Sequence, residues 1–254
     1  MKTLAATLTT IALMLTSAPT HAAEIRVLTA GAMKEVVLGL AKDFEKTSGH
    51  TVTIANDTAG GLAKRIEAGE GFDVAVITPA VIDDLISKGK MAPASRIDLA
   101  KVGIGVAVRE GAPKPDISNV EALKKTLLAA RSVAYIDPAS GGSSGIYFSG
   151  LLDRLGIAAE VKPKAKLKAG GYVAESVANG EADIAVHQIS EILPVKGVVL
   201  VGPLPAEVQR ITVYAAGIAP GPKDKSAAEA FLKHLTSPAA AALLTSKGME
   251  KAGQ

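Results

Sequence analysis

The chain has 254 residues, of which 48% are hydrophobic, 21% charged and 3% aromatic, with a formal net charge of +3 and no cysteine or tryptophan. The lack of cysteine excludes disulfides, cysteine-based catalysis, iron–sulfur clusters and thiolate zinc sites. The small, mixed charge and the scarcity of aromatic residues argue against nucleic-acid partners and against the aromatic platforms that bind sugars.

The first element along the chain has the pattern of a secretory signal peptide. Lys2 precedes an apolar run from Leu4 to Leu15, and small residues then lead to a cleavage site after Ala22 or Ala23. The run is too short to span a bilayer and is apolar on all faces, so an N-terminal core helix fits poorly. We therefore expect residues 1–22 to be removed and a mature protein of about 230 residues to act in the periplasm.

The next part of the sequence alternates short β-rich runs with helical stretches. Strands are predicted at 25–30, 51–55 and 73–77, and helices at 33–46, 61–68 and 80–88. This βαβαβα order predicts a parallel sheet with helices on its faces.

From Lys101 the same alternation resumes after a break. Strands are predicted at 102–108, 133–136, 184–186 and 210–218, and helices at 120–131, 145–155, 173–179 and 226–246. Two α/β units, with the chain returning late to the first, predict two lobes joined by crossovers near 101–108 and 203–212. We assign 23–104 and 210–254 to lobe 1 and 105–209 to lobe 2.

Four polar or glycine-rich turns stand where a predicted strand hands over to a helix, at 29–32, 56–61, 137–145 and 187–188. Such turns line the ligand crevice of an open α/β sheet, and the helix that follows presents unpaired backbone N–H groups. Each turn alone is typical of an ordinary strand-to-helix connection, but together they predict a cleft for a small anion. The expected ligand-binding residues are Gly31, Ala32, Thr58, Gly60, Gly61, Thr78, Ser143, Ser144, His187 and Gln188.

Other motifs are weaker. The GGSSG segment at 141–145 lacks the lysine and spacing of a phosphate-binding loop, and no GxGxxG, HExxH or histidine cluster is present. We therefore expect no nucleotide cofactor and no metal site. Lysines at alternate positions from Lys162 to Lys168 predict a solvated strand edge with all four side chains on one face, with anion steering as the alternative.

Four longer segments carry a family resemblance: VLTAGAMKEVVLGLAKDFEKTSGHTVTI, TAGGLAKRIEAGEGFDVAVIT, AYIDPASG and SVANGEADIAVHQISEIL. The chain resembles the periplasmic molybdate-binding-like group of solute-binding proteins of bacterial ABC importers. The resemblance implies an α/β, type II periplasmic-binding-protein fold whose two lobes close about two hinge crossovers. It also implies a small anionic ligand held by neutral hydroxyls and amides, and the membrane subunits of an ABC importer as partners. We expect a monomer.

Three positions depart from the pattern of the molybdate binders. Ala32 stands where a ligand serine is usual, Thr58-Ala59-Gly60 replaces a serine-rich turn, and His187 replaces a tyrosine. These exchanges remove expected hydroxyl donors, and the hydroxyl-rich DPASGGSSG turn favours a reshaped pocket for a larger anion such as a carboxylate. The choice among molybdate, another oxyanion and a di- or tricarboxylate stays open.

A branch of the same group is similar to aconitate isomerase, an exported enzyme that shifts a double bond by moving a proton. The alternative function is therefore a periplasmic isomerase of an unsaturated carboxylate. His187 is its first acid/base candidate because imidazole titrates near neutrality, and Glu35, Asp57 and Glu191 follow. Solute capture, which we favour, needs none of these groups to react, and His187 can instead serve only to cap its turn.

Overall fold

The computed structural model of the chain describes residues 22–253, so the predicted signal peptide lies almost entirely outside the described residues. Within that range, no helix combines the length and the apolar character that a membrane crossing requires.

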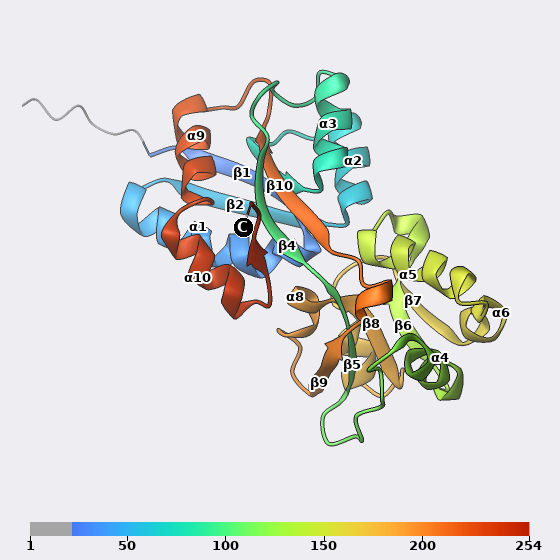
Figure 1. Cartoon of the computed structure of the whole chain (residues 1–254). Coiled ribbons are helices and arrows are strands. Elements are labelled where there is room, and N and C mark those ends of the chain that lie inside the picture. Colours follow the sequence, from blue (N-terminus) through green and yellow to red (C-terminus); the bar gives the residue numbers. More distant parts are fainter. Residues whose placement is uncertain (1–21, 254) are drawn as a thin grey trace, which may run out of the picture.

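Two lobes, each built on one β-sheet with helices packed against it, make up the described chain (Figure 1). The sheet of the first lobe has six strands in the order β11-β4-β10-β3-β1-β2. Strands β1, β2 and β3 run parallel, whereas β10 is antiparallel to both β3 and β4. The strands are β1 (Glu24–Ala30), β2 (Thr51–Asp57), β3 (Val74–Ile77), β4 (Ile97–Val102), β10 (Thr212–Ile218) and β11 (Glu250–Lys251). The helices are α1 (Lys34–Ser48), α2 (Ala59–Glu67), α3 (Pro79–Ser87), α9 (Lys225–His234) and α10 (Pro238–Ser246).

The sheet of the second lobe has five strands in the order β7-β6-β8-β5-β9. Strand β6 is parallel to β7 and β8, and β5 is antiparallel to β8 and β9. The strands are β5 (Ile104–Arg109), β6 (Val133–Ile136), β7 (Ala165–Lys168), β8 (Ile184–Gln188) and β9 (Val198–Pro203). The helices are α4 (Val120–Ala129), α5 (Ser143–Arg154), α6 (Ala158–Val161), α7 (Ala174–Ala178) and α8 (Ile189–Ile192). Short 3-10 helices η1 (Gly31–Met33), η2 (Pro138–Ser140), η3 (Lys162–Lys164) and η4 (Ala206–Val208) link the elements.

Local sequence signals fix the ends of the helices. Helix α1 buries apolar residues at helical spacing and ends at Gly49, whose φ of 74° is the left-handed conformation that glycine adopts readily. The predicted single helical tail at 226–246 is two helices, because Ser237 caps a new start and Pro238 occupies its first turn.

Each sheet has its own apolar core. In the first lobe, strands β1 and β3 are buried beneath helices, with Leu28, Ile77 and Phe231 almost fully enclosed. The second sheet is covered on both faces, by a cluster that includes Phe148 and by a smaller one around Val177. Burial on both faces explains why the central strands are continuous apolar runs rather than alternating ones.

The chain passes between the two sheets twice (Figure 1). The first passage is at Gly103, so the predicted strand 102–108 is in fact the end of β4 and most of β5, in different sheets. The second lies between β9 and β10. Gln209 joins the two passages, because its Oε1 accepts from the Ile104 amide at 2.9 Å and its Nε2 donates to the Ile104 carbonyl at 2.9 Å.

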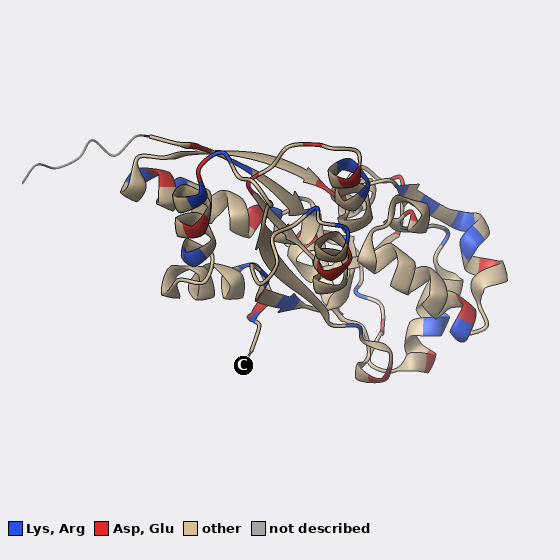
Figure 2. Cartoon of the chain, turned by 90° about the horizontal axis from the view of Figure 1, so that it is seen from above, with Lys and Arg blue, Asp and Glu red and all other residues tan. Residues whose placement is uncertain are grey.

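Positive and negative residues are mixed over both lobes, with several basic residues at the outer end of the second (Figure 2). Only Lys166 and Lys168 of the lysine-rich stretch lie on an edge strand, β7. Lys162 and Lys164 belong to η3, where Lys162 pairs with Asp153 at 2.8 Å and Lys164 donates to backbone carbonyls. The four side chains therefore do not form one strand face.

Candidate functional site: a small cavity between the lobes

A cavity of about 30 Å³ lies between the lobes at the carboxyl ends of parallel strands. This volume holds one or two water-sized groups, so the lobes must stand further apart to admit a larger anion. A larger hollow of about 640 Å³ is an open surface groove on the second lobe alone, and no described residue of the first lobe lines it. The residues that line the small cavity are Ala30, Gly31, Ala32, Asn56, Asp57, Thr58, Ala59, Ile136, Gly142, Ser143, Ser144, Gly170, Gly171, His187, Glu191 and Tyr214.

Helix starts from both lobes converge on this cavity. Helix α5 begins at Ser143, and its N-cap, Gly142, provides no side-chain oxygen to accept from the first amides. From the other lobe come the start of η1 at Gly31 and the start of α2, which Thr58 caps by accepting from the Gly61 amide. Helix N-termini carry unpaired N–H groups and partial positive charge, so these starts favour an anion between them.

Hydroxyl groups complete the polar lining. The Ser143 and Tyr214 hydroxyls lie 3.2 Å apart, across the boundary between the lobes. Gln188 lies just behind them and donates to Ser143 Oγ at 3.3 Å and to Thr212 Oγ1 at 2.9 Å. Burial, and next the nearby Glu191, raise the pKa of Tyr214 well above its usual range, so its hydroxyl stays protonated.

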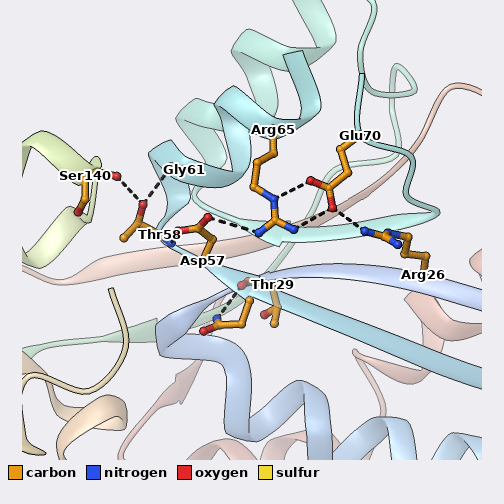
Figure 3. Close-up of polar contacts among 9 residues, drawn as sticks. Arg26, Thr29, Asp57, Thr58, Gly61, Arg65, Glu70 and Ser140 are labelled. Atoms are coloured by element: carbon orange, nitrogen blue, oxygen red, sulfur yellow. Dashed lines mark hydrogen bonds and ion pairs between the residues drawn. The ribbon is translucent and has the colours of Figure 1, made fainter. Parts of the chain in front are cut away.

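An ion-pair network supports one edge of the cavity (Figure 3). Asp57 accepts from the Thr58 amide at 2.7 Å and from Arg65 at 3.3 Å. Arg65 also binds Glu70 through two nitrogens, at 2.6 and 2.8 Å, and Glu70 pairs with Arg26 at 2.6 Å. The hydrogen bond from Arg65, followed by that from Arg26, lowers the pKa of Glu70 to about 2. Arg65 thus offsets the negative charge that Asp57 brings to the edge of the cavity.

His187 and Glu191 form a buried pair at the back of the cavity, 1% and 6% exposed, with Nε2 and Oε2 separated by 3.4 Å. Burial, and then Lys168, lower the pKa of His187 to about 3. Burial raises the pKa of Glu191 to about 8 against the opposing effect of Lys34. Burial thus favours the neutral form of both side chains, and the pKa of His187 lies below the neutral range expected from the sequence because the imidazolium loses its hydration.

The two lobes touch each other directly around the cavity. Thr58 Oγ1 donates to the Ser140 carbonyl at 2.5 Å, and the Gly60 amide donates to the Gly141 carbonyl at 3.1 Å. A Cβ atom at Gly60 would lie 2.8 Å from the Gly141 Cα, so this approach requires glycine. On the other side, the Tyr172 hydroxyl donates to Glu35 at 2.5 Å.

The structure brings together part of the residue set that the sequence predicts. Gly31, Ala32, Thr58, Ser143, Ser144 and His187 line the cavity, as do the acid/base candidates Asp57 and Glu191. Gly60 and Gly61 lie at the contact between the lobes and in the α2 cap, and Gln188 lies behind Ser143. Thr78 lines a separate hollow, and Glu35 is held by Tyr172 outside the lining.

Sequence reasoning missed Asn56, Tyr214 and the Gly170-Gly171 pair. Asn56 belongs to the 56–61 turn that the sequence did single out, but it was not among the expected ligand residues. Tyr214 gave none, because it lies in the middle of an apolar strand far along the chain. Among the described residues, no group of three or more His, Asp or Glu side chains is placed to hold a metal ion.

Comparison with known proteins places this geometry in a family. Residues 25–250 match the model of the bacterial extracellular solute-binding protein family. The chain is 35% identical to aconitate isomerase of a Pseudomonas species over 94% of both chains, and 26% identical to the molybdate-binding protein ModA of Azotobacter vinelandii over 90% of both. The solved periplasmic molybdate-binding protein of Azotobacter vinelandii superposes with a TM-score of 0.72 at 22% identity, covering 89% of this chain and 98% of that one. The predicted two-lobed, type II periplasmic-binding fold is thereby confirmed, and the chain belongs to the bacterial extracellular solute-binding protein family.

Proposed function

We propose that the mature protein captures a small anion, an oxyanion or a carboxylate, in the periplasm and delivers it to the membrane subunits of an ABC importer. The observation that carries this proposal is the convergence of three helix starts and neutral hydroxyls on one cavity between two lobes. No Lys or Arg is among the described residues that line it, so backbone dipoles and hydroxyls provide the attraction. The predicted signal peptide and the family of the chain support the location and the partner.

A thermal-shift screen tests this proposal. Molybdate, tungstate, sulfate, phosphate, citrate, and cis- and trans-aconitate are each added to the mature protein. A ligand at 100 times its dissociation constant adds about 2.7 kcal/mol to the free energy of unfolding and raises the melting temperature. Ser144→Ala should reduce the shift, whereas Ser87→Ala, at the end of α3 outside the cavity lining, should not. No shift with any of these anions would contradict the proposal.

A second candidate function is isomerisation of an unsaturated tricarboxylate. Two observations favour it: the identity to aconitate isomerase over nearly the whole chain, and a buried Glu191–His187 pair that faces the cavity. A base takes a proton from one carbon, the allylic electrons shift and the proton returns to the other end of the allyl system, so no redox partner is needed. Proton NMR of cis-aconitate incubated with the protein tests this, and a variant that binds without turning over would identify the acid/base group.

A further inference from the structure

Glu191 is a carboxyl group buried at the anion cavity, and burial favours its protonated form. It stands in α8 one turn after His187, and any Cβ at Gly31 would overlap its Oε1 atom. Glycine at position 31 therefore lets the carboxyl group lie directly against the start of η1, where an anion would bind. Its carboxyl Oε2 lies 3.4 Å from His187 Nε2.

The surroundings of Glu191 disfavour a negative charge on it. His187 is neutral, and its Nδ1 atom has no partner among the described residues. Tyr214 on β10 and Tyr172 each provide a neutral hydroxyl. Glu35, which accepts from Tyr172, and Asp57 at the cavity each provide a carboxylate. Lys34 on α1 is the cation that acts on Glu191, and burial outweighs it, holding the pKa of the carboxyl at about 8.

We propose that Glu191 meets the bound anion as a neutral carboxylic acid and donates its proton to it in a hydrogen bond, so that anion capture is coupled to the protonation of Glu191. This inference rests on the proposed function. A bound anion beside a carboxylate would be repelled, whereas beside a carboxylic acid it gains a short, charge-assisted hydrogen bond. Glu191 thereby selects anions that offer a fully ionised oxygen at this point of the cavity.

Coupling between anion binding and the protonation of Glu191 predicts how the affinity changes with pH. Below about pH 8 Glu191 is already protonated, so affinity changes little with pH. Above about pH 8 each anion must bring a proton with it, and affinity falls by about tenfold for each further pH unit. His187→Gln should keep this slope, because the proton resides on Glu191. Glu191→Gln, which retains a neutral donor of the same shape but has no proton to lose, should remove the slope.

Isothermal titration calorimetry with trans-aconitate and with molybdate, from about pH 7 to about pH 9.5 where both probes are fully ionised, tests the proposal. Titrations in two buffers of different ionisation enthalpy give the number of protons taken up, which should rise toward one per anion at high pH. Glu121→Gln makes the same chemical change on the exposed surface of α4 and should leave the slope as in the wild type. In addition, the infrared band of a protonated carboxylic acid should be present in the wild type and absent in Glu191→Gln.

The outcomes separate the two proposals. Binding without proton uptake, or a Glu191→Gln variant that keeps the wild-type slope, overturns the role of Glu191 and leaves anion capture intact. If neither probe binds the wild type, the inference falls together with the proposed capture of these anions. A Glu191→Gln variant that does not fold leaves the proton count of the wild type and the His187→Gln slope as the deciding measurements.

Discussion

At the scale of single residues, the buried histidine links the cavity to acid stability. The pKa of His187 lies at about 3 in the folded chain and at about 6.5 in an ordinary environment. Folding lowers the pKa of His187, so the neutral imidazole adds to the free energy of unfolding. This contribution is fully present above about pH 6.5 and is lost as the pH falls toward 3. We predict that His187→Gln moves the acid-unfolding midpoint to lower pH, as followed by circular dichroism.

The control for this prediction is His50→Gln, at a partly exposed position beside Phe44. It should unfold at nearly the wild-type pH. An unchanged midpoint in His187→Gln would mean that the imidazole does not lose its hydration on folding.

Tyr214 provides a second prediction at this scale. Its hydroxyl lies 3.2 Å from that of Ser143 in the other lobe, at the cavity. Tyr214→Phe removes this hydroxyl from the cavity together with its hydrogen bond to Ser143, so affinity for the anion identified by the thermal-shift screen should fall by about fivefold, or about 1 kcal/mol. Tyr135 is a buried tyrosine that meets Phe148 edge to face in the second core, and Tyr135→Phe should bind like the wild type by calorimetry. Equal affinity of the two variants would remove Tyr214 from the site.

Residues near a turn were predictable, and residues that reach the cavity across the fold were not. Ser143, Ser144 and Gly31 belong to glycine- or hydroxyl-rich turns. Turns of this composition predict the start of a helix from the sequence alone. Tyr214 reaches the same cavity from a strand that enters late and runs antiparallel to β3. No pattern of residue spacing along the chain predicts that Tyr214 lies beside Ser143.

At the scale of elements, the contact between the start of α2 and the turn before α5 controls the approach of the lobes. The backbones of Gly60 and Gly141 meet there without room for a Cβ atom. We predict that Gly60→Val weakens binding of the same anion by about 10- to 100-fold, equivalent to about 1–3 kcal/mol, because the cavity cannot close fully.

Gly71→Val is the matched control, since a Cβ atom at Gly71 meets nothing within 4 Å. Both variants should fold, as judged by their thermal melting, and only Gly60→Val should lose affinity in calorimetry. Wild-type affinity in both would show that the approach of the two glycines is not needed for binding.

The sequence predicted most elements but not where neighbouring runs divide. The elements from β1 to α3 were predicted nearly in full from alternating apolar runs and amphipathic stretches. In this part of the chain the hydrophobic period and the residues that end each helix indicate the same boundaries. The predicted strand 102–108 is divided at Gly103 between two sheets. The apolar pattern continues across Gly103, so the sequence carries no sign of this change of sheet. Strand β9 went unpredicted because its residues are only partly buried and carry no alternation.

At the scale of the whole molecule, the two passages of the chain between the sheets predict hinge closure. Gly103 and the segment between β9 and β10 are short, and Gln209 ties them together. We predict that small-angle scattering of the mature protein gives a smaller radius of gyration with a saturating anion than without one. Identical scattering curves with and without the anion would contradict closure about these passages. The lobe boundaries at 104 and 210 stay predictions.

The absence of Lys and Arg among the described lining residues has a consequence for how the protein responds to its medium. Dissolved salt screens exposed charges over a Debye length of about 8 Å at physiological ionic strength, but it does not enter a cavity between packed lobes. Attraction by helix starts and hydroxyls acts over hydrogen-bonding distances and is spared from that screening. A binding site of this kind keeps its affinity while the salinity outside the cell changes, and it discriminates among anions by the directions of their oxygen atoms.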